Sequence, residues 1–529
     1  MTVVALVGCR TTPLLSYLQA LGVLRILHEQ CAPELTSYWD GSSLHIESDL
    51  TQETISRFFV GDYEPTPMLS PWNGGGGFRT LKHEKGEQAV AQIESSGDSR
   101  LASFRAAISA ARRVWDRGRR DGWLEEKLEE KTGGTKKYKL NVYKATFLAA
   151  CRAAFPDEAL DWLDAVVVLT DAKKPQFPLL LGTGGNLGRL DLATSYMEAV
   201  SDLLDPAQVS RSTELLSHAL FGNGRPAMDA KAVGQYSPAS AGTMNSSAFG
   251  SAQSVSNLWS IVLGMEGALF FVSGIARRFG GSKGLATMPF TVSGDPAGYS
   301  AAEGETVKGE FWAPIWQRSM TVPELRRVIA EGRLSWRGKQ AANGLAGAKA
   351  LRTLGVVRGL SHFERYVIAV RFGQAPLAAP VGSFVVTRNP ADRVSLLRTP
   401  DTWLARVPRA AGSAMRRVDS AQLEVTQKPD SPAPLQNFLV ELAALEWIIS
   451  RNPKLAKAAG RPIPPLSHKR WGPELDDGSP EWRLAAALAT QQDHLSPRFT
   501  SLERQAGTAS TLLRPVTLPE THRNQFEWQ

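Results

Sequence analysis

Cysteine is scarce in this sequence, with only three residues, Cys9, Cys31 and Cys151, among 529. So few and so widely spaced cysteines exclude a disulfide framework and a Cys-x-x-Cys metal knuckle, and we expect a reducing, cytoplasmic compartment. Histidine is also scarce, with eight residues spread singly along the chain. Neither an HExxH motif nor a Walker A motif is present, which removes the common zinc hydrolases and P-loop enzymes. We therefore expect a protein without catalytic activity, metal or cofactor.

Long uncharged runs are absent too, and no hydrophobic stretch reaches the length that a bilayer span requires. The N-terminal sequence MTVVALVGCRTTP is apolar but has neither a basic n-region nor a full hydrophobic region. We therefore expect no signal peptide and no membrane association.

What the sequence does contain is typical of a globular protein, with 43% hydrophobic and 21% charged residues and a net charge of +8. This positive excess is compatible with an anionic partner. A chain of this length requires several modules. We predict an α+β fold whose N-terminal and central parts are mixed, with short strands, and whose C-terminal part is mainly helical. The predicted segments are an α+β module with a Pro/Gly-rich arm (1–98), a mainly helical module (99–235), a central α+β module (236–390) and a basic segment plus helical region (391–529).

The most specific stretch is Pro65–Phe78, PTPMLSPWNGGGGF, which we call the arm. Its prolines favour a stiff extended chain, and its four glycines allow close backbone approach and consecutive N–H donors for a phosphate. Trp72 either stacks on a base or packs into the core, and Asn73 either reads a hydrogen-bonding edge or closes a turn. The alternative is a long turn around a buried indole. The candidate binding residues are Trp72, Asn73, Gly74 and Gly75.

A basic amphipathic helix is predicted from Ser99, its expected N-cap, to about Arg120. Arginines recur every seven residues on one face with almost no acid, a spacing that matches a phosphate backbone. The alternative is a solvated charged face. The candidate phosphate contacts are Arg105, Arg112 and Arg119. After this helix we predict an exposed helix at Trp123–Lys131, a polar loop at Thr132–Lys139 and a helical region at Val142–Leu163.

A second glycine-rich turn, GTGGNLG at Gly182–Gly188, follows an apolar run and precedes a helical pattern at Leu190–Leu204. A strand, glycine turn and helix N-terminus cradle pyrophosphate in dinucleotide-binding folds. The spacing here is GxGxxxG and no second strand follows, so the pattern disfavours that fold. A turn that donates N–H groups, with Asn186 and Arg189 at its rim, remains a candidate site.

Further candidate contacts lie in the second half of the sequence. Residues 222–256 read as an irregular loop or linker, and Leu258–Phe279 as an apolar helix that leads into a basic glycine turn. Alternation from Tyr366 predicts a strand. The candidate polar contacts in these loops and strands are Gln235, Asn245, Lys283, Arg358 and Arg371.

Four segments carry a resemblance to a known family. They are YEPTPMLSPWNGGGGF, LLGTGGNLGRLD, residues 234–245, and FWAPIWQRS with the later LGVVRGLSHFERYVIAVRFG. In this order they resemble the large-subunit family of the type I-G (formerly I-U) CRISPR interference complex. The resemblance covers about Leu6 to Val386 and weakens over the C-terminal part. It departs from the family pattern at Leu187 and Phe372, where an acid and an asparagine are expected.

The resemblance implies a non-catalytic subunit of an RNA-guided surveillance complex of the Cascade kind. Such a subunit binds the 5′ region of the crRNA and the target double-stranded DNA, recognises the PAM, and supports R-loop formation. Its implied partners are the CRISPR backbone subunits, the crRNA-processing subunit, and a helicase-nuclease recruited in trans. In such complexes the protein reads PAM and shape, and base pairing reads sequence. Two other functions remain open, a nucleotide-binding enzyme that uses Gly182–Gly188 and a scaffold that contacts only protein.

Overall fold

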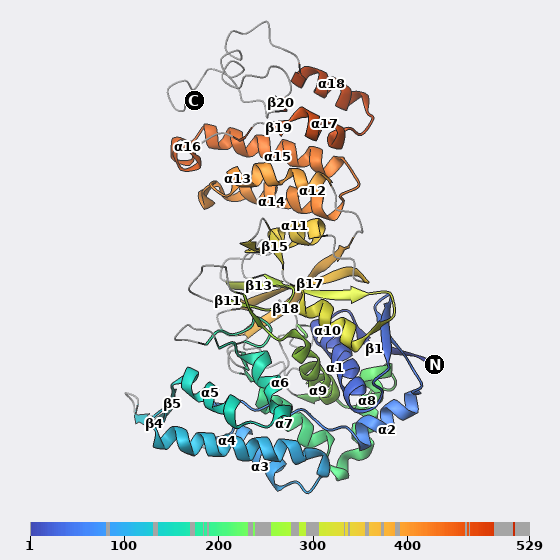
Figure 1. The fold of residues 1–529 in the computed structure, drawn as a ribbon, viewed down its shortest axis with the longest axis vertical. Coiled ribbons are helices and arrows are strands. Elements are labelled where there is room, and N and C mark those ends of the chain that lie inside the picture. Colours follow the sequence, from blue (N-terminus) through green and yellow to red (C-terminus); the bar gives the residue numbers. More distant parts are fainter. Residues whose placement is uncertain are drawn as a thin grey trace. The chain divides into compact units, whose positions relative to one another are not determined.

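The computed structural model divides the chain into two compact units (Figure 1). Unit 1 comprises residues 1–295, 301–334 and 358–383, and unit 2 comprises residues 296–300, 335–357 and 384–529. The four segments predicted from the sequence stay a prediction. The structure describes residues 2–80, 85–130, 136–169, 175–182, 185–187, 190–230, 236–238, 255–276, 285–292, 306–332, 334–336, 339–354, 359–371, 375–386, 392–460, 463–464, 466–490 and 512–513.

The expected α+β fold is confirmed. Unit 1 begins with a strand, a helix and a strand pair, and these strands form an antiparallel sheet with β14 in the order β1-β3-β2-β14. Gly41 has a φ of +56° at the turn of the β2–β3 hairpin, a left-handed conformation that favours glycine. The bounds are β1 (Thr2–Arg10), α1 (Leu14–Gln30), β2 (Thr36–Asp40), β3 (Ser43–Ser48) and β14 (Met320–Thr321).

Two helices far apart in the sequence, α1 and α9 (Leu258–Ala268), pack together inside unit 1 (Figure 1). Both are buried almost all round, which is why their sequences show little amphipathic pattern. Glycines permit the close approach, because a Cβ at Gly22 would collide with the Leu263 carbonyl and one at Gly267 with the Leu18 carbonyl. The predicted helix Leu258–Phe279 is corrected here. After α9 the chain forms a short 3-10 turn and then strand β10 (Gly274–Ala276).

A buried carboxylate joins this helix pair to the start of the arm. Glu266 on α9 accepts hydrogen bonds from the hydroxyls of Tyr63 and Tyr196 and from the Thr66 backbone N–H, at 2.6–3.0 Å. Its second oxygen receives the guanidinium of Arg25 at 2.7 Å. Because Tyr63 and Thr66 lie at the start of the arm, whereas Arg25 and Tyr196 belong to other parts of unit 1, this network fixes where the arm begins.

Among the remaining helices of unit 1, those at residues 102–120, 144–166 and 192–203 follow predicted segments with local corrections, and those at Lys85–Ser95 and Val209–Phe221 were not predicted. Thr51 and Thr321 cap α2 and α10 through capping boxes. The basic helix is preceded by a 3-10 turn (Ser99–Leu101) whose cap is Asp98, not the expected Ser99. The region predicted at 142–163 is two helices, because Pro156 starts a new one. The bounds are α2 (Gln52–Gly61), α3 (Lys85–Ser95), α4 (Ala102–Arg120), α5 (Lys144–Ala154), α6 (Asp157–Val166), α7 (Leu192–Leu203), α8 (Val209–Phe221) and α10 (Val322–Ala330).

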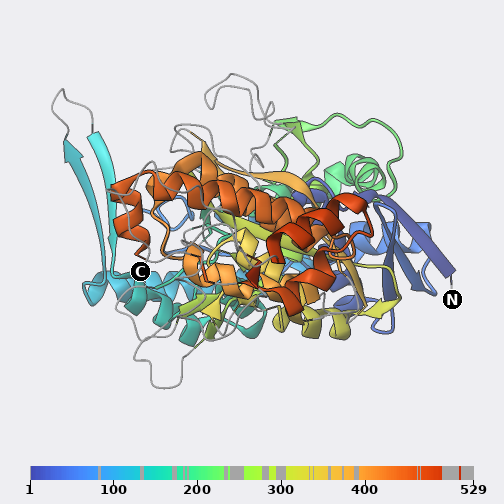
Figure 2. The same cartoon turned by 90° about the horizontal axis from the view of Figure 1, so that it is seen from above.

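The segment after α4 is a two-stranded ribbon, which corrects the predicted exposed helix and polar loop. Strand β4 (Leu124–Glu130) pairs antiparallel with β5 (Lys136–Val142), and Figure 2 shows them in cyan, extending away from the helices. Gly122, with φ +75°, ends α4, and the Trp123 N–H bonds back to the Gly118 carbonyl. The Glu- and Lys-rich residues have good helix propensity, but this stop and the pairing of an acidic with a basic strand override it.

A second sheet has the strand order β12-β13-β17-β18. Strand β13 contains the aromatic residues of the FWAPIWQRS segment, and the strand predicted from Tyr366 is β17, which begins earlier, at Leu360. Its interior holds the ion pair of Arg365 with Glu310 at 2.6 Å, and the guanidinium also lies over the Trp312 ring. The bounds are β12 (Thr291–Val292), β13 (Thr306–Trp316), β17 (Leu360–Arg371) and β18 (Ala375–Val385), and short pairs form at β6 (Asn186–Leu187) with β7 (Leu190–Asp191), β8 (Asp229–Ala230) with β9 (Val255–Ser256), and β10 with β11 (Leu285–Thr287).

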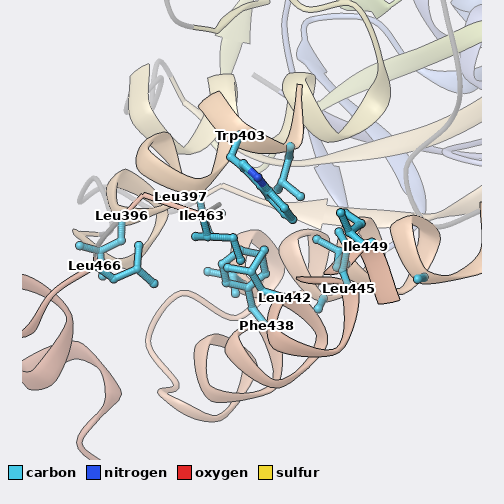
Figure 3. Packing of buried hydrophobic residues seen from close by; sticks show 14 of the residues in the cluster. Leu396, Leu397, Trp403, Phe438, Leu442, Leu445, Ile449, Ile463 and Leu466 are labelled. Atoms are coloured by element: carbon cyan, nitrogen blue, oxygen red, sulfur yellow. The ribbon is translucent and has the colours of Figure 1, made fainter. Parts of the chain in front are cut away.

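Unit 2 is mainly helical, as predicted, and has its own core. Figure 3 shows Trp403, Phe438 and Leu442 packed together within it. Lys349 on α11 is buried and bonds Asp401 at 2.8 Å and Gln422 at 2.9 Å, which ties three helices together. The bounds are β15 (Ser335–Trp336), β16 (Lys339–Gln340), α11 (Gly344–Leu354), α12 (Asp392–Leu396), α13 (Arg398–Leu404), α14 (Gly412–Gln427), α15 (Ala433–Ser450), α16 (Pro453–Ala459), β19 (Leu466–Ser467), α17 (His468–Leu475), α18 (Pro480–Thr490) and β20 (Leu512–Leu513).

No helix among the described residues of either unit combines the length and the apolar character needed to cross a membrane.

Candidate nucleic-acid interface

The arm and the second glycine turn, which the sequence separates by more than 100 residues, lie against each other. The Thr194 hydroxyl donates to the Gly75 carbonyl at 2.7 Å, and the Trp162 indole N–H donates to the Leu69 carbonyl at 2.9 Å. A Cβ at Gly185 would lie 2.9 Å from the Ser70 hydroxyl oxygen and 3.0 Å from the Trp162 ring. Gly185 is therefore needed for packing against the arm, which leaves no space there for a ligand.

The four glycines of the arm have different surroundings. A Cβ at Gly76 would collide with the Ser70 carbonyl, and one at Gly77 would collide with the Gly86 carbonyl of α3. A Cβ at Gly75 would meet the Asp191 side chain at 3.1 Å. Only at Gly74 is the space open, with the nearest atom, Arg79 Nη2, 4.0 Å away. Close approach of a ligand to the arm backbone is therefore confined to Gly74.

Asp191 is a buried carboxyl that connects the two glycine segments. It is the N-cap of α7 and accepts the Thr194 N–H at 3.1 Å. Burial raises its pKa to about 6, and hydrogen bonds from Thr194 and the Asn73 side chain partly oppose this rise. Within the described residues, its Oδ2 atom has no hydrogen-bond partner. Asp191 thus holds Asn73 in place at an electrostatic cost.

A groove of about 1040 Å³ runs from the arm to the base of the ribbon. We call it the arm groove. Its walls come from the arm, the end of α4, both strands of the ribbon and the start of α5. Its volume matches the upper end of the range, roughly 300–1000 Å³, that sites for small organic ligands occupy. Its lining residues are Trp72, Asn73, Gly74, Arg119, Gly122, Trp123, Leu124, Glu125, Leu140, Asn141, Val142, Tyr143 and Lys144.

Two cations line the arm groove, and neither forms an ion pair with a described residue. Arg119 is exposed at the end of α4, and Lys144 is half-buried at the start of α5, with its ammonium 5.5 Å from the centre of the Phe177 ring. Desolvation by burial lowers the Lys144 pKa. The one lining carboxylate, Glu125, is paired with Lys127 at 2.7 Å. The groove therefore offers two positive charges to an anion.

Two aromatic rings stand at the base of the ribbon, where the Tyr143 N–H bonds the Trp123 carbonyl at 2.8 Å. The Trp123 ring is half-buried, and the guanidinium of Arg117 lies 5.0 Å from its centre. The Tyr143 side chain is 72% exposed. Arginine, lysine and aromatic side chains beside an open glycine backbone are the combination that nucleic-acid-binding surfaces use.

Four of the predicted binding residues, Trp72, Asn73, Gly74 and Arg119, line the arm groove, and Gly75 lies next to Gly74. Trp72 is 1% exposed, so of its two interpretations the buried one holds, and its ring has no free face for a base. Asn73 is also buried, at 3% exposure.

The structure differs from the prediction that the arginines of this helix form one exposed face with almost no acid. Arg105 is half-buried, and its Nη1 donates to the carbonyls of Ser96 and Asp98 at 2.9 and 2.8 Å. Arg112 forms a two-pronged ion pair with Glu94. The sequence of α4 contains no sign of this acid, because it comes from the neighbouring helix α3. Arg119 alone of the three lines the groove.

The other candidate contacts lie outside what the structure describes. Arg189, Gln235, Asn245, Lys283 and Arg358 are not among the described residues. For Asn186 and Arg371 the backbone belongs to β6 and β17, and their side chains lie outside the described part.

The sequence did not indicate Trp123, Asn141, Tyr143 or Lys144 as site residues. Trp123 directly precedes β4, Asn141 lies near the end of β5, and Tyr143 and Lys144 follow β5, so the pairing of β4 with β5 brings them together at the base of the ribbon. A signal was present in the spacing of the two aromatics, Trp123 and Tyr143, which an antiparallel ribbon between them could bring together.

The glycine turn also lacks the surroundings of a dinucleotide site. The chain before it, at residues 178–182, is irregular, and the two-residue strands β6 and β7 pair antiparallel with each other. A comparison of the chain with known protein-family models and with curated proteins found no match in either.

Proposed function

We propose that this chain is the non-catalytic large subunit of a type I-G CRISPR RNA-guided surveillance complex and acts in the cytoplasm. It binds the 5′ region of the crRNA and the target DNA, recognises the PAM and supports R-loop formation. Its partners are the backbone subunits, the crRNA-processing subunit and the helicase-nuclease that it helps to recruit. The proposal starts from the ordered set of four sequence motifs.

The observation that carries the proposal is the composition of the arm groove. The most specific motif of the sequence, at Trp72–Gly74, lines the same groove as two aromatic rings and two cations that form no ion pair with a described residue. Arg119 and Lys144 provide charge for phosphates, and Gly74 allows close backbone approach. Asn73 is the candidate for reading a base edge, because an amide can both donate and accept and the residue lines the groove although only 3% of it is exposed.

The test is a binding selection with short duplexes whose flanks are randomised, at two salt concentrations, with the chain alone and with co-expressed partner subunits and guide RNA. We expect enrichment of a short flank motif that requires the assembled complex. Binding that depends on salt but shows no flank motif, even in the complex, would contradict PAM recognition and favour a basic scaffold.

Two substitutions separate the roles within the groove. Asn73→Ala should change or relax the selected motif, because a base-edge contact is lost. Arg119→Ala should weaken binding of all flanks alike and reduce the salt slope, because a phosphate contact is lost. Arg113→Ala, on an exposed part of the same helix outside the groove, is the matched control and should change neither quantity. Thermal melts check that each variant is folded.

A further inference from the structure

Tyr143 is an exposed aromatic ring that packing does not explain. Among the large hydrophobic residues exposed in the described part of the chain it has the highest exposed fraction, 72%, and it is the one aromatic. It occupies the N-cap position of α5 but makes no side-chain capping bond there. Exposure of this area to water costs free energy that a functional contact would recover.

The neighbouring Trp123 ring is less available. It is half-buried, and Arg117 covers it at 5.0 Å. Arg117 is held in turn by Asp121 at 3.2 Å. Trp123 is therefore a fixed wall of the groove, and Tyr143 is the ring that can accept a partner on its face.

The two cations line the same groove as this ring. Lys144 follows Tyr143 directly in the chain, and Arg119 lines the same groove from the end of α4. A base stacked on Tyr143 would therefore carry its own phosphates toward positive charges. A duplex does not offer this contact, because its base faces are stacked on one another inside the helix and only base edges are accessible in the grooves.

We propose that the arm groove binds an unpaired nucleotide segment, with one base stacked on Tyr143 and the adjacent phosphates at Arg119 and Lys144. This deepens the proposed function and rests on it, because a surveillance complex contains two unpaired strands, the ends of the guide RNA and the displaced DNA strand. Both share the required chemistry, a splayed base on a phosphate backbone.

The test measures binding of the purified full chain to a fluorescent dT 12-mer, an rU 12-mer and a 12-base-pair duplex. Tyr143→Leu removes the aromatic face but keeps an apolar side chain, and it should weaken binding to the single strands at least about fivefold, the lower limit for loss of one base–aromatic contact. Tyr143→Phe and Tyr143→Trp should retain wild-type affinity. Duplex affinity should stay within about twofold for all three variants, since stacking alone is changed.

The charge contacts give a second readout. Arg119→Ala should lower the salt dependence of single-strand binding by about 0.7 in the logarithmic slope, the value for one lost phosphate contact. Arg113→Ala should leave it unchanged. Equal loss of duplex and single-strand binding in Tyr143→Leu, or unchanged single-strand binding, would overturn the inference. A preference for rU over dT would assign the site to guide RNA, and the reverse to the displaced strand.

This outcome can be separated from that of the proposed function. If the assembled complex selects a flank motif but Tyr143→Leu binds single strands normally, the stacking site is wrong and the large-subunit role stands. If Tyr143→Leu loses single-strand binding but no flank motif is selected, the stacking site stands and PAM recognition is wrong.

Discussion

Asp191 carries a carboxylate whose charge is unfavourable where it lies. Its side chain is buried against Gly75, caps α7 and is hydrogen-bonded by Asn73, so its position helps to define the arm groove. Its folded-state pKa of about 6 is above its ordinary value of 3.8. The folded state thus binds the proton more tightly than the unfolded chain, and the resulting stability is fully present below about pH 4 and is lost as the pH rises through about 6.

Asp191→Asn should therefore change the stability of the protein more favourably at pH 7.5 than at pH 4.5. The amide keeps a cap acceptor and removes a charge whose burial costs about 3 kcal/mol at neutral pH. Thermal melts at the two pH values measure this as a more positive change in Tm at pH 7.5. Asp205→Asn, at the exposed N-cap of a 3-10 turn, is the matched control and shows how the same substitution changes Tm at a solvent-exposed position. An equal change in Tm at both pH values would contradict the prediction for Asp191.

At the scale of single residues, the sequence predicts which residues line the site better than it predicts whether each is buried or exposed there. Trp72, Asn73, Gly74 and Arg119 do meet in one groove. Their burial could not be predicted, because it depends on packing against α6 and α7, which come about 90 to 120 residues later. The features that single out Tyr143 and Gly74, an exposed ring and open space beside the glycine, exist only in the folded structure.

In the arm, alanine substitutions at two glycines should change the free energy of unfolding by very different amounts. Gly76→Ala places a methyl group against the Ser70 carbonyl and should destabilise the protein by about 1–3 kcal/mol or more. Gly74→Ala meets open space, so the free energy of unfolding should change by less than about 0.5 kcal/mol. Denaturant unfolding measures both. The same Gly74→Ala variant should weaken nucleic-acid binding, and normal binding would argue against close backbone approach there.

The ribbon is the element that sequence patterns predicted least well. Glu- and Lys-rich segments have good helix propensity, and although Tyr138, Leu140 and Val142 alternate with polar residues in β5, β4 has no such alternation. Two features decide the structure: Gly122, which ends α4, and cross-strand pairs such as Glu129 with Lys137. The cross-strand pairs are non-local, so a helix pattern in one strand does not reveal them. By contrast, the sequences of α1 and α15 indicate helices directly, because long apolar runs with good helix formers leave few alternatives.

At the scale of the whole molecule, the arm groove is built entirely from unit 1, and the core around Phe438 belongs to unit 2. Phe438→Ala should cost about 3–5 kcal/mol in the unfolding of unit 2, because a fully buried ring is removed. Single-strand binding at 10 °C should persist. Val440→Ala, exposed on the same helix, is the matched control. Loss of binding in the Phe438 variant at a temperature where its helical signal is retained would show that the groove depends on unit 2.

The α+β class and the helical C-terminal part followed from composition and periodicity. The division into units did not, because unit 2 takes residues 335–357 from the middle of the chain. Lys349 on that segment is held by Asp401 and Gln422, and such side-chain partners have no signature in the local sequence.

The packing of α1 against α9 has a consequence for synthesis in the cell. Arg25 and its partner Glu266 are 241 residues apart in the chain. At translation rates of roughly 5–20 residues per second, α1 is made about 10 to 50 seconds before the helix that covers it. During this interval one of the most apolar segments of the protein is exposed at the ribosome. The nascent chain should therefore be a strong client of ribosome-associated chaperones until residue 268 has emerged.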